Sequence, residues 1–264
     1  MDLGIKNRRA LILGASKGLG YASARALAGE GVAVALSSSD LGRARTAGEK
    51  IAGETGATAV PLLGDVSNPD NMNVLAREAQ QALGGPIDIL VNNHGGPPLG
   101  AAMDLQETDL IEQFNKMVVS LIRLTGLLVP DMIAQHWGRI ITIGSQGNIQ
   151  PLPNMALSNT LRSAMVGYTK TLANEVIKDN VTVNIVAPGA VLTDRTRSSA
   201  EFNAKKRGIT PEEILAEREQ KLIGGKYGKP EDFGAMVAFL CSQYAGYCTG
   251  GIWRFDGGNI KSIV

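Results

Sequence analysis

The sequence of 264 residues has only two cysteines, Cys241 and Cys248, which is too few for a disulfide framework and typical of a reducing cytoplasm. Neither sign of charge dominates, since 26 Lys and Arg residues stand against 25 Asp and Glu residues. There is thus no basic excess for nucleic-acid phosphates or an anionic membrane surface. The N-terminus lacks an apolar signal core, and no uninterrupted apolar run approaches membrane-spanning length. These absences predict a soluble cytoplasmic protein with no nucleic-acid partner, no membrane partner and no metal.

What the sequence does contain is an alternation of short apolar runs with longer segments of helical period. Seven runs are almost continuously apolar, which is typical of strands that are covered by helices on both faces. They are residues 9–13, 32–36, 59–63, 87–92, 139–143, 181–186 and 251–255. The helical segments are residues 18–29, 40–53, 70–83, 107–135, 153–179 and 230–242. The alternation predicts an α/β fold: a single Rossmann-type, doubly wound domain over residues 1–264, with a seven-stranded parallel sheet.

One long irregular stretch, residues 192–227, follows the sixth predicted strand. It contains a polar helical piece, residues 210–222, which begins where Thr210 can cap a helix and Pro211 can take its first position. In open α/β folds an excursion at the carboxyl end of a strand commonly covers the substrate. We therefore predict a substrate lid here, and the alternative is a purely structural insertion.

The first predicted strand runs directly into a glycine-rich turn and then into a helix. Glycines allow the sharp turn, let backbone amides approach a pyrophosphate, and permit close packing of helix on sheet. The helix N-terminus adds aligned N–H groups and a partial positive charge. We assign the dinucleotide phosphates to residues of this turn: Gly14, Ser16, Lys17, Gly18, Leu19 and Gly20.

Four further motifs follow the glycine turn in chain order. They are Gly64-Asp65-Val66, Val91-Asn92-Asn93-His94-Gly95, the segment from Asn184 to Asp194, and the tail with Tyr247-Cys248-Thr249-Gly250 and Asp256-Gly257-Gly258. Together with the glycine turn, these motifs resemble the short-chain dehydrogenase/reductase family, in particular its bacterial 3-oxoacyl-carrier-protein reductases. The likeness extends over essentially the whole chain.

The resemblance implies which residues hold each part of the cofactor. At the adenine it places Asp65 and Val66, and beside the adenosine ribose it places Asn92, His94 and Gly95. Around the nicotinamide amide it places Pro188, Gly189, Val191 and Thr193. Every part of a nicotinamide dinucleotide therefore has a matching segment.

The end of the second strand indicates which dinucleotide is bound. Proteins selective for NAD(H) usually place there an acid that binds the ribose hydroxyls and repels a 2′-phosphate. Here Ser38 aligns with that acid and Ser39 follows it, while Lys17 and Arg43 are cations near enough to pair with a phosphate. Asp40 would partly repel the phosphate, and the two cations could instead be solvated surface charges. We predict NADP(H) in preference to NAD(H).

The catalytic positions of the family match less well. Family members use an Asn, a Ser and a Tyr-x-x-x-Lys pair, in which the Lys lowers the Tyr pKa from about 10 toward neutrality so that the Tyr can move a proton. Ser145 aligns with the serine, and counting from it and from the end of the following helix places Ser158 at the Tyr and Arg162 at the Lys. The Asn position falls on Met117, and Asn115, at about 100° per residue, faces another side of the helix.

These substitutions change the chemistry that is expected. Ser158 and Arg162 share a helix face at i, i+4 spacing, and with Ser145 they could polarise a carbonyl oxygen as an oxyanion hole does. A serine is too weak an acid to replace the tyrosine, and Arg162 can bind ribose hydroxyls but cannot shuttle protons. His94, whose unperturbed pKa is near 6.5, is a candidate proton donor. The alternative for His94 is packing against the adenosine or capping the turn that follows it.

The sequence thus predicts an NADP(H)-dependent oxidoreductase that acts on a carbonyl/alcohol pair with non-standard proton delivery. One alternative is a catalytically silent NAD(P)-binding sensor or assembly subunit, and another is a redox-neutral isomerase or lyase. The substrate is a small-molecule or acyl-thioester carbonyl compound. Cations of the predicted lid would attract an acidic group, unless they are simply solvated: Arg195, Arg197, Lys205, Lys206 and Arg207. The resemblance also implies a homo-oligomer, a homotetramer before a homodimer, paired through the two long helices.

Overall fold

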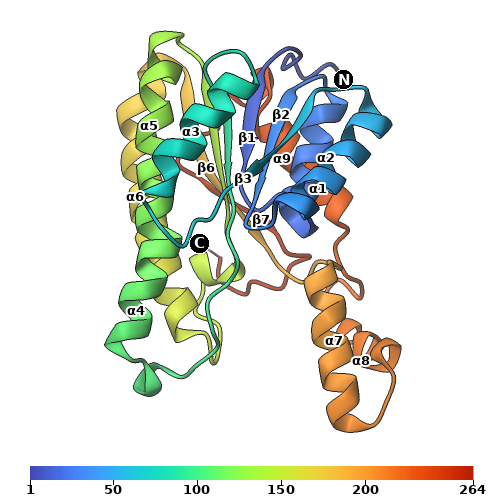
Figure 1. Cartoon of the computed structure of the whole chain (residues 1–264). Coiled ribbons are helices and arrows are strands. Elements are labelled where there is room, and N and C mark those ends of the chain that lie inside the picture. Colours follow the sequence, from blue (N-terminus) through green and yellow to red (C-terminus); the bar gives the residue numbers. More distant parts are fainter. Residues whose placement is uncertain (264) are drawn as a thin grey trace.

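A seven-stranded parallel sheet runs through the centre of the protein, which we describe from a computed structural model for residues 1–263 (Figure 1). The strands are β1 (Arg9–Ile12), β2 (Ala33–Ser38), β3 (Ala59–Leu63), β4 (Ile89–Asn92), β5 (Gly138–Ile143), β6 (Val181–Pro188) and β7 (Ile252–Phe255). Their order is β3-β2-β1-β4-β5-β6-β7, and each neighbouring pair is parallel. The predicted fold class is confirmed, and each strand begins and ends within two residues of its predicted bounds.

Helices cover both faces of the sheet (Figure 1). One layer holds α1 (Gly18–Gly29), α2 (Leu41–Thr55) and α9 (Pro230–Leu240), and the other holds α3 (Asn71–Ala82), α5 (Ser120–Ala134) and α6 (Ala156–Val176). Successive strand residues point to opposite faces, so Ala10 and Ile12 join the core under α1, while Leu11 and Leu13 join the core under α5. Both sides of each central strand are therefore buried, which explains why the strands read as continuous apolar runs.

The helix predicted over residues 107–135 contains a π-helical turn. After α4 (Glu107–Phe114), the segment η2 (Asn115–Val119) widens so that the N–H of Ser120 bonds to the carbonyl of Asn115, five residues back. The hydroxyl of Ser120 donates to the carbonyl of Val66 at 2.7 Å, which ties the turn to the segment after β3. As a result Met117 is buried in the core and Asn115 is exposed.

The whole helical run Glu107–Ala134 is long and apolar enough to cross a membrane by length and composition. Half of its most apolar window is nevertheless buried inside the protein. The buried residues pack on the sheet with α3 and α6, as expected for a core helix.

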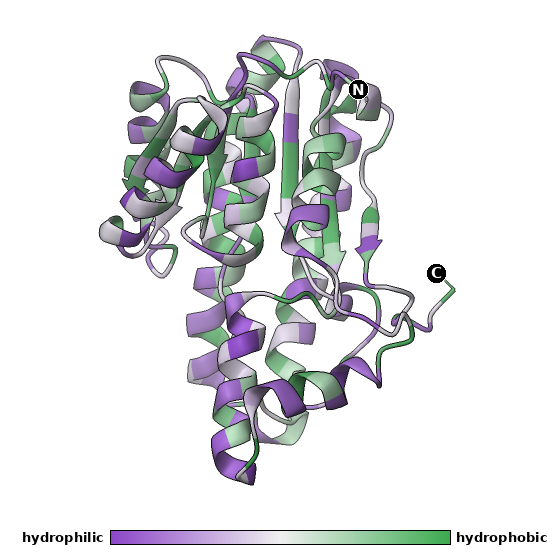
Figure 2. Ribbon diagram, turned by 90° about the vertical axis from the view of Figure 1, so that its right-hand side faces the viewer, coloured by the Kyte–Doolittle hydropathy of each residue, from purple (hydrophilic) through white to green (hydrophobic). Residues whose placement is uncertain are grey.

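The segment 192–227 forms two helices, α7 (Asp194–Arg207) and α8 (Pro211–Glu219), of which the sequence predicted only the second. They pack on each other through Ala200, Ala204 and Ile214. Because so few residues are buried, α7 has almost no apolar periodicity from which a helix could be predicted. The start of α8 is as predicted, because Thr210 accepts a hydrogen bond from the N–H of Glu213 and Pro211 is the first helical residue. The pair projects beyond the carboxyl ends of the strands (Figure 1), and this part is largely hydrophilic (Figure 2).

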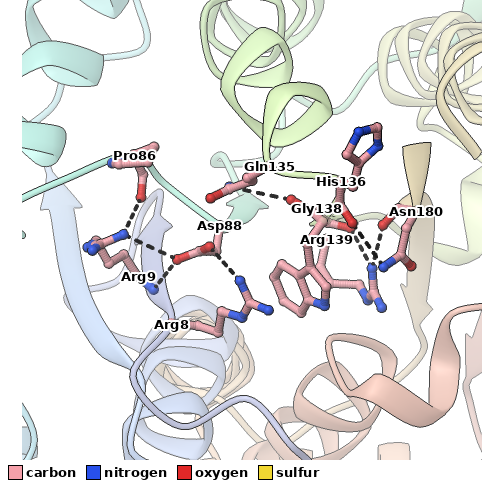
Figure 3. Close-up of polar contacts among 10 residues, drawn as sticks. Arg8, Arg9, Pro86, Asp88, Gln135, His136, Gly138, Arg139 and Asn180 are labelled. Carbon is pink, nitrogen blue, oxygen red and sulfur yellow. Dashed lines mark hydrogen bonds and ion pairs between the residues drawn. The ribbon is translucent and has the colours of Figure 1, made fainter.

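A buried polar cluster fastens the opposite, amino-end edge of the sheet (Figure 3). Asp88, just before β4, accepts hydrogen bonds from the backbone N–H of Arg9 at 2.8 Å and from Nη1 of Arg8 at 3.0 Å. The guanidinium groups of Arg8 and Arg139 lie 3.8 and 4.5 Å from the centre of the Trp137 ring, within cation–π range. The fully buried Arg139 also donates to the carbonyls of Gly138, Asn180 and Ser242.

Replacing the buried carboxylate should measurably weaken the fold. Asp88→Asn removes the charge that pairs with Arg8, and we expect the free energy of unfolding to fall by about 2 kcal/mol. Asp70→Asn is the matched control, because Asp70 pairs with Arg123 on an exposed surface, where an ion pair adds little. Urea unfolding measures both variants, and equal losses would contradict a special role for the Asp88 cluster.

Candidate active site

The carboxyl ends of β1 and β4 mark the point where the chain reverses its direction across the sheet. Strand β1 lies between β2 and β4, so the crossover connections leave it toward opposite sides. Ligands of open α/β sheets bind at such a switch point, outside the carboxyl ends of the strands. The glycine turn after β1 and the segments after β4, β5 and β6 all reach this edge.

The glycine turn is shaped by contacts that leave no room for side chains. Gly14 and Gly18 have φ values of 56° and 61°, in the left-handed region that favours glycine. A Cβ atom on Gly20 would lie 2.4 Å from the carbonyl oxygen of Gly14, so α1 packs directly on the turn. Nδ2 of Asn93 donates to the same oxygen at 3.1 Å. Asn93, to which the sequence assigned no role, therefore holds the turn in the shape that a pyrophosphate requires.

A cavity of about 1130 Å³ opens beside this turn, between α1, α2 and the start of α7. Five of the residues assigned to the cofactor line it: Ser16, Lys17, Gly18, Arg43 and Thr193. Tyr21 and Tyr227 also line the cavity. Within the described chain their hydroxyls are buried and have no hydrogen-bond partner. The cavity therefore reaches the phosphate turn, whereas Asp65, Asn92, Ser145 and Arg162 lie outside its lining.

At the end of β2, serines and one ion pair face the glycine turn. Oγ of Ser38 donates to Oγ of Ser16 at 3.2 Å, and Ser39 is exposed next to it. Asp40 caps α2 by accepting from the backbone N–H of Arg43, and its carboxylate pairs with Nε of Arg43 at 3.0 Å. These hydrogen bonds from Arg43 hold the pKa of Asp40 below its ordinary value. The acid that would repel a 2′-phosphate is thus compensated by a neighbouring cation.

The residues assigned to the adenosine differ in how freely they can reach a ligand. Asp65 is exposed, and both of its oxygens accept from Ser67, which lowers the pKa of the carboxyl group. Val66 packs against the core. Asn92 is buried and its Nδ2 donates to Thr125 of α5 at 3.2 Å, so this amide faces the helix layer.

His94 lies just beyond β4 with Nδ1 at 2.7 Å from the carbonyl oxygen of Gly95. Because a carbonyl only accepts, Nδ1 carries the hydrogen and Nε2 keeps its lone pair. Burial, and after it the positive charge of Arg162, lowers the pKa of His94 to about 4. A neutral imidazole bonded to its own turn fits the turn-capping alternative better than proton donation at neutral pH.

Ser145, Ser158 and Arg162 are brought together at the end of β5. Nε of Arg162 donates to Oγ of Ser158 at 3.2 Å along α6. Asn148 connects this pair to Ser145, because its Oδ1 accepts from the N–H of Ser145 at 2.8 Å and its Nδ2 donates to the carbonyl of Arg162 at 3.1 Å. Asn148 was missed from the sequence, although Ser-x-x-Asn is a capping pattern that signals such a turn.

The guanidinium of Arg162 keeps its charge in this setting. Burial, followed by the like charge of Arg195, lowers the pKa of Arg162 to about 10. Arg162 is therefore protonated at neutral pH and supplies a fixed positive charge beside Ser158.

Gln146, in the segment after β5, directs an unused donor toward Gly189 at the end of β6. Nε2 of Gln146 is buried and forms no hydrogen bond within residues 1–263, and it would lie 3.0 Å from a Cβ atom on Gly189. Pro188 ends β6, Val191 is buried, and Thr193 caps α7. An orphaned amide donor at this place fits the carboxamide of a nicotinamide.

Comparison with known proteins agrees with this geometry. Residues 14–259 match the family model described as Enoyl-(Acyl carrier protein) reductase. The chain is 31% identical over 260 residues to 3-oxoacyl-(acyl-carrier-protein) reductase FabG of Aquifex aeolicus, covering 98% of this chain and 99% of that one. It is 33% identical over 260 residues to D-beta-hydroxybutyrate dehydrogenase of Cupriavidus necator, covering 96% and 98%.

A solved structure is similar along its whole length. L-Sorbose reductase from Gluconobacter frateurii, complexed with NADPH and L-sorbose, superposes with a TM-score of 0.95 at 31% identity and covers 100% of both chains. The chain belongs to the short-chain dehydrogenase/reductase family, as its motifs predicted.

The depressed pKa of His94 is directly measurable. The imidazole of His94 is half protonated at about pH 4 in the folded protein but near pH 6.5 in the unfolded protein. The unfolded state then binds more protons between these pH values, so the free energy of unfolding should fall as pH drops from about 6.5 to 4. NMR titration of the imidazole C–H should show a midpoint near 4, with His136, which is largely exposed, as the internal comparison. A midpoint for His94 near 6.5 would contradict the account and restore it as a proton donor.

Proposed function

We propose that the protein is an NADP(H)-dependent oxidoreductase that interconverts a carbonyl group and an alcohol. The observation that carries the proposal is the grouping of Ser145, Ser158 and Arg162, joined by Asn148, at the strand edge that also holds the dinucleotide turn. Two hydroxyls and a fixed cation beside a nicotinamide segment are suited to a polarised carbonyl oxygen. The overall balance is one carbonyl, one NADPH and one proton converted to one alcohol and NADP⁺.

The hydrogen-bond directions support carbonyl binding. Oγ of Ser145 accepts from the N–H of Gly147 at 3.1 Å, and Oγ of Ser158 accepts from Nε of Arg162. Each serine therefore keeps its own O–H available to donate to a substrate oxygen. Bound NADPH supplies the hydride, while these donors and the charge of Arg162 stabilise the negative charge that develops on the oxygen.

Proton delivery follows from the same contacts. Arg162 is fully protonated at neutral pH and His94 is neutral, so neither group donates the proton in this mechanism. We assign delivery to solvent water on the side of the partly exposed Ser145, because Ser158 is buried and its oxygen is held by Arg162. This is the non-standard element of the proposal, since solvent water takes the place of a side-chain acid whose pKa would match the working pH.

A second candidate function is a catalytically silent NAD(P)-binding sensor or assembly subunit. The low pKa of His94 and the permanent charge of Arg162 favour it, because the site then has no side chain that exchanges protons near pH 7. A redox-neutral isomerase or lyase remains a weaker alternative, because its chemistry would not use the hydride of a bound cofactor.

NADP(H) is the cofactor we propose, rather than NAD(H). Ser38 stands where an acid would select NAD(H), Lys17 lines the cavity, and the charge of Asp40 is compensated by Arg43. The similar L-sorbose reductase was solved with NADPH. We also propose that residues 192–227 act as the substrate lid and that the protein is cytoplasmic, which fits its two free cysteines.

The substrate class follows in outline from the relatives. One is named for a 3-oxoacyl-carrier-protein and another for a hydroxybutyrate, so a small-molecule or acyl-thioester carbonyl substrate is proposed. We propose a homotetramer in preference to a homodimer. Large apolar side chains that remain exposed on the α4–α5 run support such a pairing: Ile111, Phe114 and Leu127.

The cofactor proposal predicts a selective effect at Lys17. Lys17→Met removes a charge-assisted contact to the 2′-phosphate, so affinity for NADPH should fall about tenfold while affinity for NADH stays unchanged. Lys6→Met, an exposed lysine outside the cavity, is the control. Fluorescence titration measures the dissociation constants of NADPH and NADH for the unaltered protein and for both variants. Tighter binding of NADH than NADPH by the unaltered protein would refute the preference.

Turnover tests the oxidoreductase directly. NADPH absorbance is followed with a panel of carbonyl compounds, including 3-oxoacyl thioesters and diketones, and oxidation should fall at least about 100-fold in Ser145→Ala. Ser163→Ala is the matched control, because this exposed serine of α6 bonds only to the carbonyl of Asn159. Tight NADPH binding without turnover on the whole panel would reject the oxidoreductase in favour of the silent sensor.

A further inference from the structure

Two arginines from different parts of the chain lie near the segments that follow β4 and β5, close enough for the charge of one to act on the other. Arg162 comes from α6 and touches Ser158. Arg195 is the second residue of α7, and its guanidinium reaches across to the segment after β4, where Nη1 would lie 2.9 Å from a Cβ atom on Gly96. Gly96 has no side chain to occupy this place, so a lid cation lies against the loop that also holds His94.

The charges of these groups act on one another. Burial lowers the pKa of both Arg162 and His94, and after burial the charge of Arg195 acts on Arg162 and the charge of Arg162 acts on His94. No carboxylate contributes to the pKa of either group. Within residues 1–263 neither Arg162 nor Arg195 forms an ion pair.

Arg207, in the same segment, is by contrast paired with a carboxylate of the lid. Arg207, at the end of α7, is held by Glu217 of α8 through two hydrogen bonds of 2.7 and 2.9 Å. Its charge is neutralised within the lid itself. Arg195 has no such partner and is directed at the cleft instead.

Arg162 is partly buried and loses hydration, and the like charge of the exposed Arg195 adds repulsion, unless an anion lies between the two groups. The phosphates of the cofactor already have the backbone amides of the glycine turn and the cations Lys17 and Arg43 along the cavity. Arg162 lies instead beside the hydroxyls assigned to the substrate carbonyl. The unpaired positive charge is therefore at the substrate end.

We propose that the substrate is an oxo acid or hydroxy acid, whose carboxylate binds between Arg162 and Arg195 while Ser145 and Ser158 hold its carbonyl or alcohol oxygen. The proposal rests on the proposed function and names its substrate class. Two planar guanidinium groups can each bind a carboxylate through paired N–H donors. Arg195 is exposed in this structure, so binding would draw the start of α7 onto the substrate and close the cleft.

Binding to NADP⁺-saturated protein tests the proposal without requiring turnover. Calorimetry is run with pyruvate, acetoacetate and 2-oxoglutarate, and with the methyl ester of each acid. At least one acid should bind more than tenfold more tightly than its ester. Arg195→Met should abolish that difference, and Arg162→Lys, which keeps the charge, should retain part of it.

Lys205→Met is the matched control, because it removes one exposed lid cation about 15 Å along α7 from Arg195. It should leave the binding of the acids unchanged. Equal binding of acids and esters, or an Arg195→Met variant that binds acids normally, would overturn the proposal. Acids that bind the cofactor-free protein but not the NADP⁺-saturated protein would also overturn it, because the two arginines would then serve the phosphates of the cofactor.

Failure of this proposal is distinguishable from failure of the oxidoreductase. NADPH oxidation by neutral carbonyl compounds, with no preference for acids, would leave the oxidoreductase standing and reject the carboxylate site. Acid binding that depends on Arg195, without NADPH oxidation by any compound, would keep the carboxylate site and reject the oxidoreductase.

Discussion

A half-buried guanidinium without a carboxylate partner is costly, because it loses hydration that nothing nearby replaces. Arg162 is held in that position by its bond to Ser158 and by the amide of Asn148 on its backbone. Burial, and after it the charge of Arg162, keeps His94 neutral, and the same charge interacts with Arg195 of the lid. In the proposed mechanism this one cation would polarise a substrate oxygen and attract an anion, but it would not pass on a proton.

The scaffold places that cation by ordinary α/β packing. The parallel sheet carries the segments after β1, β4, β5 and β6 to one edge, and the contact of Gly20 with Gly14 fixes the phosphate turn there. The opposite edge is fastened by Asp88 and the arginines around Trp137. A rigid base of this kind leaves the helices beyond the carboxyl ends of the strands as the part that can adapt to a substrate.

The sequence predicts the fold well where burial dominates. Strands covered on both faces are continuously apolar, and a glycine turn between strand and helix has few other interpretations, so the sheet and α1 were correct. Helix α7 was missed because Ala200 and Ala204 are its only buried residues, which leaves no periodic signal. The π-helical turn was missed because it depends on a tertiary bond from Ser120 to Val66.

The sequence predicts only some of the residues of the candidate active site. Ser145, Ser158 and Arg162 were located through the resemblance to the family's catalytic positions, and i, i+4 spacing then placed Ser158 and Arg162 on one helix face. The role of Gln146 could not be predicted, because it depends on the tertiary approach to Gly189. Asn148 has a signal in its Ser-x-x-Asn capping pattern. Arg195 was predicted only as one of five lid cations, because its position against Gly96 depends on the fold. The low pKa of His94 likewise depends on burial and on Arg162, which no linear motif encodes.

The most direct test of the account is to follow the hydride itself. NADPH that carries deuterium at the transferring C4 position is mixed with the protein and an oxo acid in a single turnover, and the product is examined by mass spectrometry. The account predicts a hydroxy acid that carries one deuterium on its new C–H carbon. Full binding of the cofactor with no deuterated product from any carbonyl compound would contradict it.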